Sequence, residues 1–270
     1  MTIEFSVDSI LNMSITDRRK QILDVLSAEG EINTTVLSER LGVTGATLRT
    51  DIRALEREGA IVRFHGGIRL PRKTLSYSGE NYMVRAVTHV ELKNQIGKAA
   101  ADLVADGSTI FMDASSTTFH MIPFLQSRKN VTVVTNGIHT AMELQRCSNF
   151  KSVIILGGML RPHSGAIEGL SCKEMIGRLS ADIYFVSGNG FSPESGLSGD
   201  NFYELELKRL CAERAKRIAA LIDSTKLMTD SASSFISADK IDYLITDSGA
   251  SEESVRKCRE KGLNVIVAEA

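Results

Sequence analysis

Four consecutive hydroxyl-bearing residues, 115–118, follow the apolar run STIFMD, residues 108–113. Where a buried strand turns into a helix, hydroxyls and backbone N–H groups can bind the oxygens of an anion such as a phosphate. Asp113, directly before the row, could accept hydrogen bonds from sugar hydroxyls. The row predicts a phosphate cradle made of Ser115, Ser116, Thr117 and Thr118.

Small polar turns follow five other apolar runs. In a parallel α/β sheet, ligands bind outside the carboxyl ends of the strands, which meet at one edge. Any one of these turns could equally be an ordinary helix cap, but their occurrence after successive runs favours a site. Asn136 could accept or donate hydrogen bonds, and Lys226 or Arg161 could supply a cation. The turns are residues 135–137, 157–158, 187–190, 223–226 and 246–247.

A different chemistry is indicated near the N-terminus, where a predicted helix carries Leu48, Ile52 and Leu55 at the spacing of a buried face. The opposite face is polar and followed by a glycine-rich hairpin. Arginine suits bidentate contact with guanine, and threonine can contact a phosphate or a thymine methyl. The helix and hairpin together supply the candidate DNA-binding residues Thr44, Gly45, Thr47, Arg49, Thr50, Arg53, Arg63 and His65.

The arginine-bearing helix has a plainer interpretation as an amphipathic helix with a solvated charged face. The turn before it, the spacing of its cap and the hairpin behind it favour DNA binding. Asp51 is acidic among the arginines, and we expect it to pair with one of them or with the scaffold rather than to contact DNA.

The elements that carry these residues fall into two domains. Three helical patterns and a hairpin over residues 14–70 predict a winged helix-turn-helix, mostly α with a β hairpin, and residues 71–90 predict a linker. Over residues 91–270 seven short apolar runs alternate with amphipathic stretches. That alternation predicts an α/β domain with a mostly parallel, Rossmann-like sheet covered on both faces.

Composition excludes several classes of protein. The chain has 270 residues and a net charge of −1, so any DNA-binding charge must be local. No apolar window approaches the length of a membrane span, and a cytoplasmic protein without a metal site or cofactor is expected. The GNG at residues 188–190 is not a dinucleotide fingerprint. Whether Met1 or Met13 is the true start stays open.

The segment from RRKQILDVL to VRFHGG resembles the DNA-binding domain of the DeoR family of bacterial transcriptional regulators. The recognition stretch of that family usually reads Ser-x-x-Thr-Ile-Arg-Arg-Asp-Leu. Here Thr44 stands first, and the later residues are Thr47-Leu48-Arg49-Thr50-Asp51-Ile52. Because Thr50 replaces the second arginine, one contact typical of the family is altered, and a different preferred operator is expected.

The resemblance continues from about residue 91 to 245 through DASSTT, VVTNG, ILGGMLR, SGNGFSPESGLS, DSTK and YLITD. These blocks are similar to the effector domain of the family, whose fold is similar to that of ribose-5-phosphate isomerase and whose members typically respond to phosphorylated sugars. The resemblance implies that an effector pocket is lined by Asp113, Ser115, Ser116, Thr117, Thr118, Asn136, Gly157, Gly158 and Lys226, to which we add Arg161 and Asn189 as candidates.

Three functions follow as alternatives. The first is a repressor of a carbohydrate-catabolism operon, acting as a homo-oligomer (dimer or tetramer) on operator DNA and controlled by a sugar phosphate. The second is an isomerase-like enzyme, which is disfavoured because the turn Ser187-Gly188-Asn189-Gly190-Phe191 lacks the carboxylates of the isomerases. The third is a constitutive DNA-binding protein whose second domain only oligomerises.

Overall fold

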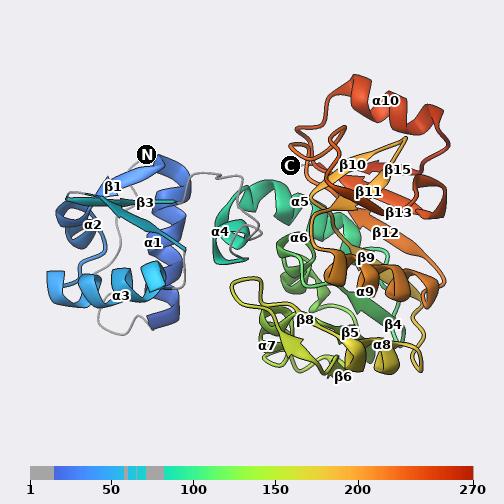
Figure 1. Cartoon of the computed structure of the whole chain (residues 1–270), viewed down its shortest axis with the longest axis horizontal. Coiled ribbons are helices and arrows are strands. Elements are labelled where there is room, and N and C mark those ends of the chain that lie inside the picture. Colours follow the sequence, from blue (N-terminus) through green and yellow to red (C-terminus); the bar gives the residue numbers. More distant parts are fainter. Residues whose placement is uncertain (1–14, 58–59, 65, 71–81, 270) are drawn as a thin grey trace. The chain divides into compact units, whose positions relative to one another are not determined.

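The computed structural model describes residues 15–57, 60–64, 66–70 and 82–269. The chain divides into two compact units, Met1–Thr88 and His89–Ala270, each with its own core. Figure 1 shows the helical first unit in blue and the larger second unit in green to red. The fold class expected from the sequence, a helix-turn-helix unit followed by a parallel α/β unit, is confirmed.

The first unit joins short helices to a small antiparallel sheet of strand order β1-β3-β2. Asn33 begins the second helix, because its side chain accepts a hydrogen bond from the backbone N–H of Thr35 (2.8 Å). The first strand was not anticipated from the sequence. The elements are α1 (Ile15–Glu29), β1 (Glu31–Asn33), α2 (Thr34–Arg40), α3 (Gly45–Arg57), β2 (Val62–Phe64) and β3 (Gly67–Arg69).

A further helix, α4 (Tyr82–Val87), lies inside the segment predicted as a linker. Its Val84 and Val87 are buried in the core of the first unit, and the helix packs against α1. Two apolar residues three positions apart were too short a pattern to indicate a helix. The earlier part of the predicted linker, residues 71–81, lies outside the described residues.

The second unit is built on a seven-stranded sheet of order β15-β14-β12-β9-β4-β5-β6, in which every pairing is parallel. Its strands lie within the seven apolar runs predicted from the sequence, except that β6 begins two residues earlier. They are β4 (Thr109–Met112), β5 (Val131–Thr135), β6 (Phe150–Ile155), β9 (Ile183–Val186), β12 (Ile218–Leu221), β14 (Tyr243–Thr246) and β15 (Val265–Val267).

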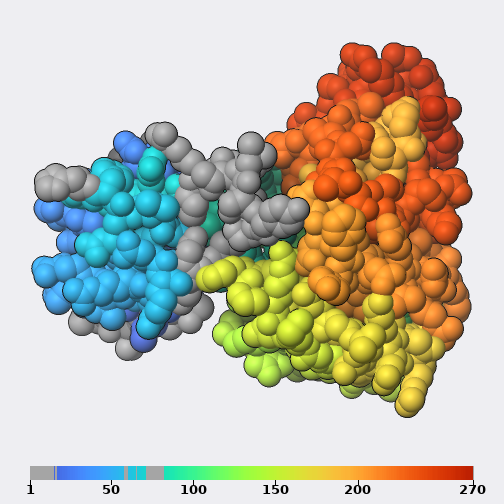
Figure 2. Space-filling model, viewed as in Figure 1, coloured from blue at the N-terminus to red at the C-terminus, as the bar shows by residue number. Residues whose placement is uncertain are grey.

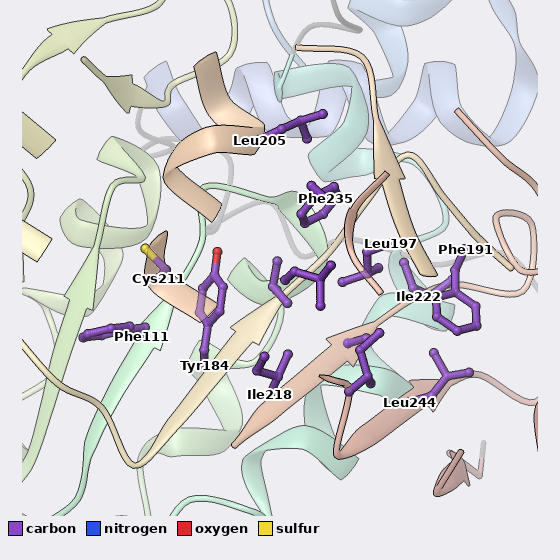
Figure 3. Close-up of a cluster of buried hydrophobic side chains, with 14 of the residues drawn as sticks. Phe111, Tyr184, Phe191, Leu197, Leu205, Cys211, Ile218, Ile222, Phe235 and Leu244 are labelled. Atoms are coloured by element: carbon purple, nitrogen blue, oxygen red, sulfur yellow. The ribbon is translucent and has the colours of Figure 1, made fainter. Parts of the chain in front are cut away.

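Helices cover both faces of this sheet, as its apolar strands require. On one face α8 (Leu170–Ile176), α9 (Phe202–Glu213) and α10 (Glu252–Glu260) pack in one cluster, in which the Phe111 and Tyr184 rings meet edge to face at 6.3 Å (Figure 3). On the other face α5 (Val90–Ala101) and α7 (Ile138–Leu144) pack in a second cluster. Alternate residues of β4 point to the two clusters.

Short elements complete the carboxyl edge of the sheet. Helix α6 (Ser116–Phe119) follows β4, and a hairpin of β7 (Met159–Leu160) and β8 (Ile167–Glu168) follows β6. A second sheet pairs β10 (Gly190–Ser192), β11 (Gly196–Gly199) and β13 (Ser233–Ile236). No helix of the described residues has the length and apolar character needed to cross a membrane.

Candidate functional site

The recognition helix α3 presents the predicted polar face to solvent. Leu48, Ile52 and Leu55 are buried, as the spacing predicted, whereas Arg49 and Arg53 are exposed. The Thr44 hydroxyl accepts a hydrogen bond from the N–H of Thr47 (3.2 Å) and so caps the helix. The Arg49 Nε donates to the carbonyl of Gly45 (3.0 Å), and the Thr50 hydroxyl to that of Ala46 (3.1 Å).

Asp51 holds this helix on its scaffold. The carboxylate is buried, and it accepts hydrogen bonds from the Nε atoms of Arg18 (2.5 Å) and Arg19 (3.3 Å) on α1. The expected pairing is thus with the scaffold, and α3 is fixed against α1 at the turn that carries Arg49. On the hairpin, Arg63 lies 3.8 Å from Glu56. His65 lies outside the described residues.

In the second unit, the polar turns meet at the carboxyl edge of one parallel sheet. The chain runs from β4 through β5 to β6 on one side, and β9, β12, β14 and β15 lie on the other side of β4. The strand order therefore reverses between β4 and β9, and a crevice at such a reversal is where open α/β sheets bind ligands. Asp113 follows β4 and Ser187 follows β9, one on each side of this point.

Asp113 organises this point of the sheet. Its Oδ1 accepts hydrogen bonds from the N–H of Ser115 (3.0 Å) and the hydroxyl of Thr118 (2.8 Å). Its Oδ2 accepts from the N–H of Ser187 (3.0 Å) and lies 3.0 Å from the Nζ of Lys208. Both oxygens are already bonded, so Asp113 positions the cradle instead of offering a free acceptor to a sugar hydroxyl, the role suggested by the sequence.

Lys208, on α9, is a buried cation that was not predicted from the sequence as part of the site. Its Nζ also donates to the carbonyl of Ser187 (2.8 Å) and lies 3.1 Å from the Glu204 carboxylate, which in turn lies 3.4 Å from Arg161. Burial lowers the pKa of Lys208. The charges of Asp113 and Glu204 raise it by more than burial lowers it, so the net shift is upward. We name Arg161, Glu204, Lys208 and Asp113 the charge chain.

The same balance acts on Asp113. Burial raises the pKa of its carboxyl, whereas the charge of Lys208 and the hydrogen bonds from Ser115 and Ser187 lower it, and the lowering prevails. Both groups are therefore held in their charged forms. The charge chain alternates in sign from the cradle to the β7–β8 hairpin, which is the arrangement that makes buried charges tolerable.

The cradle hydroxyls divide into two kinds. Ser115 caps α6 by accepting from the N–H of Thr118 (3.2 Å), and the Thr118 hydroxyl bonds to Asp113. The Thr117 hydroxyl oxygen is buried and has no hydrogen-bond partner within the protein. Ser116 is buried as well. Of the four hydroxyls predicted to bind phosphate, two are thus used within the turn, and that of Thr117 is left without a partner.

Other unpaired oxygens lie at the same edge. The hydroxyl oxygens of Thr140 after β5, Ser187 after β9 and Thr246 at the end of β14 are buried without a hydrogen-bond partner in the protein. A Cβ atom on Gly137 would lie 3.0 Å from both Ala114 Cα and Thr140 Oγ1, so the Thr140 hydroxyl lies close to the cradle. We name Thr117, Thr140, Ser187 and Thr246 the unpaired hydroxyls.

The remaining candidates surround this edge. Asn136 is buried and donates to the carbonyl of Ile167 (3.1 Å), which ties the β7–β8 hairpin to the end of β5. The Gly157 carbonyl accepts from Cys172 Sγ, and a Cβ on Gly158 would lie 2.5 Å from the carbonyl of Glu168. Only glycine allows this close approach.

Two candidates lie on the other side of β4. Asn189 is exposed on the turn after β9, and its amide donates to Asp200 (2.7 Å). Lys226 follows β12, and its Nζ lies 3.2 Å from Asp223 Oδ2. Burial raises the pKa of the Asp223 carboxyl, but the charge of Lys226 lowers it, and the net shift is downward. The charge of the buried Lys93 of α5 adds to this lowering.

The residues missed from the sequence share a recognisable signal. Lys208 lies on the same helical stripe as the buried Leu205 and Cys211, and Lys93 shares a stripe with the buried Ile96. A lysine on an apolar stripe must find partners when the helix packs. Of the unpaired hydroxyls, that of Thr117 was predicted and those of Ser187 and Thr246 lie in predicted turns, whereas that of Thr140 gives no comparable signal. Among the described residues, no group of three His, Cys, Asp or Glu side chains is placed to hold a metal ion.

Two family descriptions match this chain. Residues 18–74 match the DeoR-like helix-turn-helix domain, and residues 88–248 match the DeoR C terminal sensor domain. The HTH-type transcriptional regulator GolR of Listeria innocua is 38% identical over 253 residues, which cover 94% of this chain and 98% of GolR. The glycerol-3-phosphate regulon repressor of Escherichia coli K12 is 26% identical, over 87% of this chain and 92% of the repressor.

The solved structures to which this chain is similar include ribose 5-phosphate isomerase A from Neisseria gonorrhoeae. The TM-score is 0.39 at 15% identity, and the likeness covers 52% of this chain and 54% of the isomerase. Relatives that span nearly the whole chain are instead named as transcriptional regulators and repressors, which supports a regulator and not an enzyme. With both domains matched in order, the chain belongs to the DeoR family of DNA-binding transcriptional regulators.

Proposed function

We propose that this protein represses a carbohydrate-catabolism operon and that a phosphorylated sugar, bound at the carboxyl edge of the sheet, controls it. The observation that carries the proposal is the set of unpaired hydroxyls. A buried polar group without a partner costs about 1–3 kcal/mol, so native proteins keep such groups where water or a ligand satisfies them. Sugar and phosphate oxygens are partners of the required kind.

The site has cations to match an anionic ligand. Lys226 is partly exposed beside the end of β12, and Arg161 is partly exposed at the hairpin that Asn136 holds. The oxygens of the unpaired hydroxyls are enclosed, so an effector reaches them only as the surrounding turns move. A ligand that prefers the moved conformation shifts the population towards it, which is the property a sensor needs.

Operator binding is assigned to the first unit. A helix-turn-helix places its second helix in the major groove, and paired copies bind half-sites about 34 Å apart or a multiple of that distance. We therefore propose a homo-oligomer that acts on double-stranded operator DNA in the cytoplasm. The names of two relatives, a glycerol-3-phosphate regulon repressor and a putative aga operon repressor, support this function.

The proposal is tested in two steps. Genomic DNA fragments are selected on the purified protein at about 150 mM salt, where weak electrostatic binding is suppressed. A discrete, repeated or palindromic site is expected, and its neighbouring genes nominate sugar phosphates for a thermal-shift panel with the matching unphosphorylated sugars as controls. Failure to select any site would contradict the regulator, and a panel without any shift would contradict phosphosugar control.

Replacing Arg49 with alanine tests base recognition directly. Arg49 is exposed near the start of α3, and its loss should weaken operator binding by about 1–3 kcal/mol and relax the preference at one base pair. Binding is measured by fluorescence anisotropy on the selected operator and on variants of it. An equal loss on every DNA sequence would instead make Arg49 a phosphate contact. Arg146→Ala, an exposed arginine of the second unit that pairs with Glu143, serves as the control.

A further inference from the structure

Five large apolar side chains lie exposed on neighbouring elements of the second unit. Met159 and Leu160 form β7, Leu170 is the first residue of α8, and Phe202 and Tyr203 begin α9. Their exposed fractions range from 52% to 78%. Soluble monomers rarely expose a contiguous apolar surface of more than a few hundred Å² without a function for it. We name these five residues the apolar patch.

Specific contacts bring the three elements together. The Asn201 amide, directly before α9, donates to Glu168 (3.2 Å), which lies two residues before Leu170. Arg161, directly after β7, pairs with Glu204 of α9 (3.4 Å). In the space-filling view, the yellow surface that holds α8 and the hairpin adjoins the orange surface of α9 (Figure 2). The apolar patch is therefore one surface and not scattered side chains.

We propose that the apolar patch is the contact surface for a second copy of this chain. A two-fold interface brings the same surface of both copies together, so a patch with charges of one sign would repel its own copy. Here the charges beside the patch are balanced, because Lys173 of α8 forms an ion pair with Glu206 of α9. An apolar centre with a neutral polar surround suits self-association.

The extent of the patch agrees with such an interface. Each partner of a standard interface buries about 800 Å². Large aromatic side chains bury about 150–250 Å² each when they are fully covered. Phe202 and Tyr203 still expose 67% and 75% of theirs. Together with three aliphatic side chains and the glycines at residues 157 and 158, which are also exposed, the surface reaches the order of magnitude that a stable pair needs.

The position of the patch also links assembly to the effector site. Leu160 precedes Arg161, and Tyr203 precedes Glu204, so the patch adjoins the outer end of the charge chain that holds the cradle. A second copy would thus contact the elements that carry the sensor. This inference rests on the proposed function only in that an operator-binding protein of this kind is expected to pair.

The test uses Leu170→Glu and Tyr203→Glu, each in the full-length chain, with mass measured by sedimentation velocity over a wide range of protein concentration. Both residues lie in the first turn of a helix, where a carboxylate is favourable, so folding should be preserved. Because each change occurs twice across a two-fold interface, the dissociation constant should rise by about 100-fold or more in both variants.

Two further variants separate this surface from others. Tyr203→Phe keeps the apolar area, and its dissociation constant should stay that of the wild type. Met142→Glu changes an exposed apolar residue of α7, on the opposite face of the sheet, and should leave assembly intact. A monomeric wild type, or full assembly of both glutamate variants, would overturn the proposal. Dissociation by Met142→Glu alone would place the interface elsewhere and overturn it too.

Failure here is distinguishable from failure of the proposed function. Assembly is measured without DNA or effector, whereas the proposed function depends on operator selection and sugar-phosphate shifts. If the apolar patch contacts another part of the same chain or a different protein instead of a second copy, the glutamate variants retain the wild-type mass. That outcome would leave the regulator in place and remove only the second copy from this surface.

Discussion

Replacing Lys208 with methionine is expected to lower the free energy of unfolding of the second unit by about 3–5 kcal/mol. Methionine keeps most of the volume of lysine and removes the charge, so Asp113 remains buried without its cation. Its Oδ2 would keep only the hydrogen bond from Ser187, and Glu204 would lose its contact with Lys208 at 3.1 Å. A buried charge that loses its partner is far more costly than an exposed one.

The matched control is Lys216→Met. Lys216 forms an ion pair with Asp182 at 2.8 Å, but its side chain is 76% exposed, so a change within about 0.5 kcal/mol is expected. Chemical denaturation gives the free energy, and hydrogen exchange of the amides of β4 and β9 assigns the loss to this unit. Equal effects of the two substitutions would show that the charge chain contributes no more than a surface pair.

The pH dependence of the Lys208 variant follows from the direction of the shifts. In the wild type the pKa of Asp113 is lowered, so its contribution to stability is present above the unfolded pKa and is lost as the pH falls through the folded pKa. Without Lys208, burial is no longer offset by that charge, and the pKa of Asp113 should rise. The difference in the free energy of unfolding between the wild type and the Lys208 variant should therefore be larger at about pH 7 than at about pH 5.

Much of the fold could be predicted because the apolar runs are unambiguous. The runs that contain β4, β5 and β12 are short, bounded by polar turns and buried on both faces, a pattern that helices of this length do not give. The second sheet was missed because its strand GLSG, residues 196–199, has no β-branched or alternating pattern. Strands of this kind are specified by their partners and not by their own residues.

The sequence predicted the turns of the candidate site but not the contacts of their individual atoms. The sequence places DASSTT at a strand end, and the fold makes that end the point where the strand order reverses. Which hydroxyls are used internally depends on Asp113, Lys208 and Ser187, which are brought together by α9 and β9 from far along the chain. Contacts of such long range have no signature in local composition, so the contacts that hold the cradle and the charge chain needed the structure.

The second large effect is expected from Thr117→Val, which should weaken effector binding by about 10- to 100-fold while leaving operator binding unchanged. Valine matches the shape of threonine and removes the hydroxyl whose oxygen is buried without a partner. The substitution should therefore leave the stability of the ligand-free protein unchanged or raise it by about 1 kcal/mol. Thermal shifts with the sugar phosphate identified for the wild type measure the effector affinity and the stability of the ligand-free protein. Fluorescence anisotropy on the selected operator measures operator binding.

The adjacent Thr118 supplies a control that separates function from packing. Its hydroxyl donates to Asp113 at 2.8 Å, so Thr118→Val should lower stability by about 1–3 kcal/mol, because it leaves a buried carboxylate short of a donor. Two neighbouring threonines with the same substitution are thus expected to differ in the sign or size of their effect on folding. A loss of stability in Thr117→Val equal to that in Thr118→Val, or unchanged effector affinity, would show that the unpaired hydroxyl of Thr117 does not serve a ligand. The expected contrast arises because a protein that keeps an unsatisfied buried oxygen gives up stability at that position, and the bound effector is the partner that compensates for it.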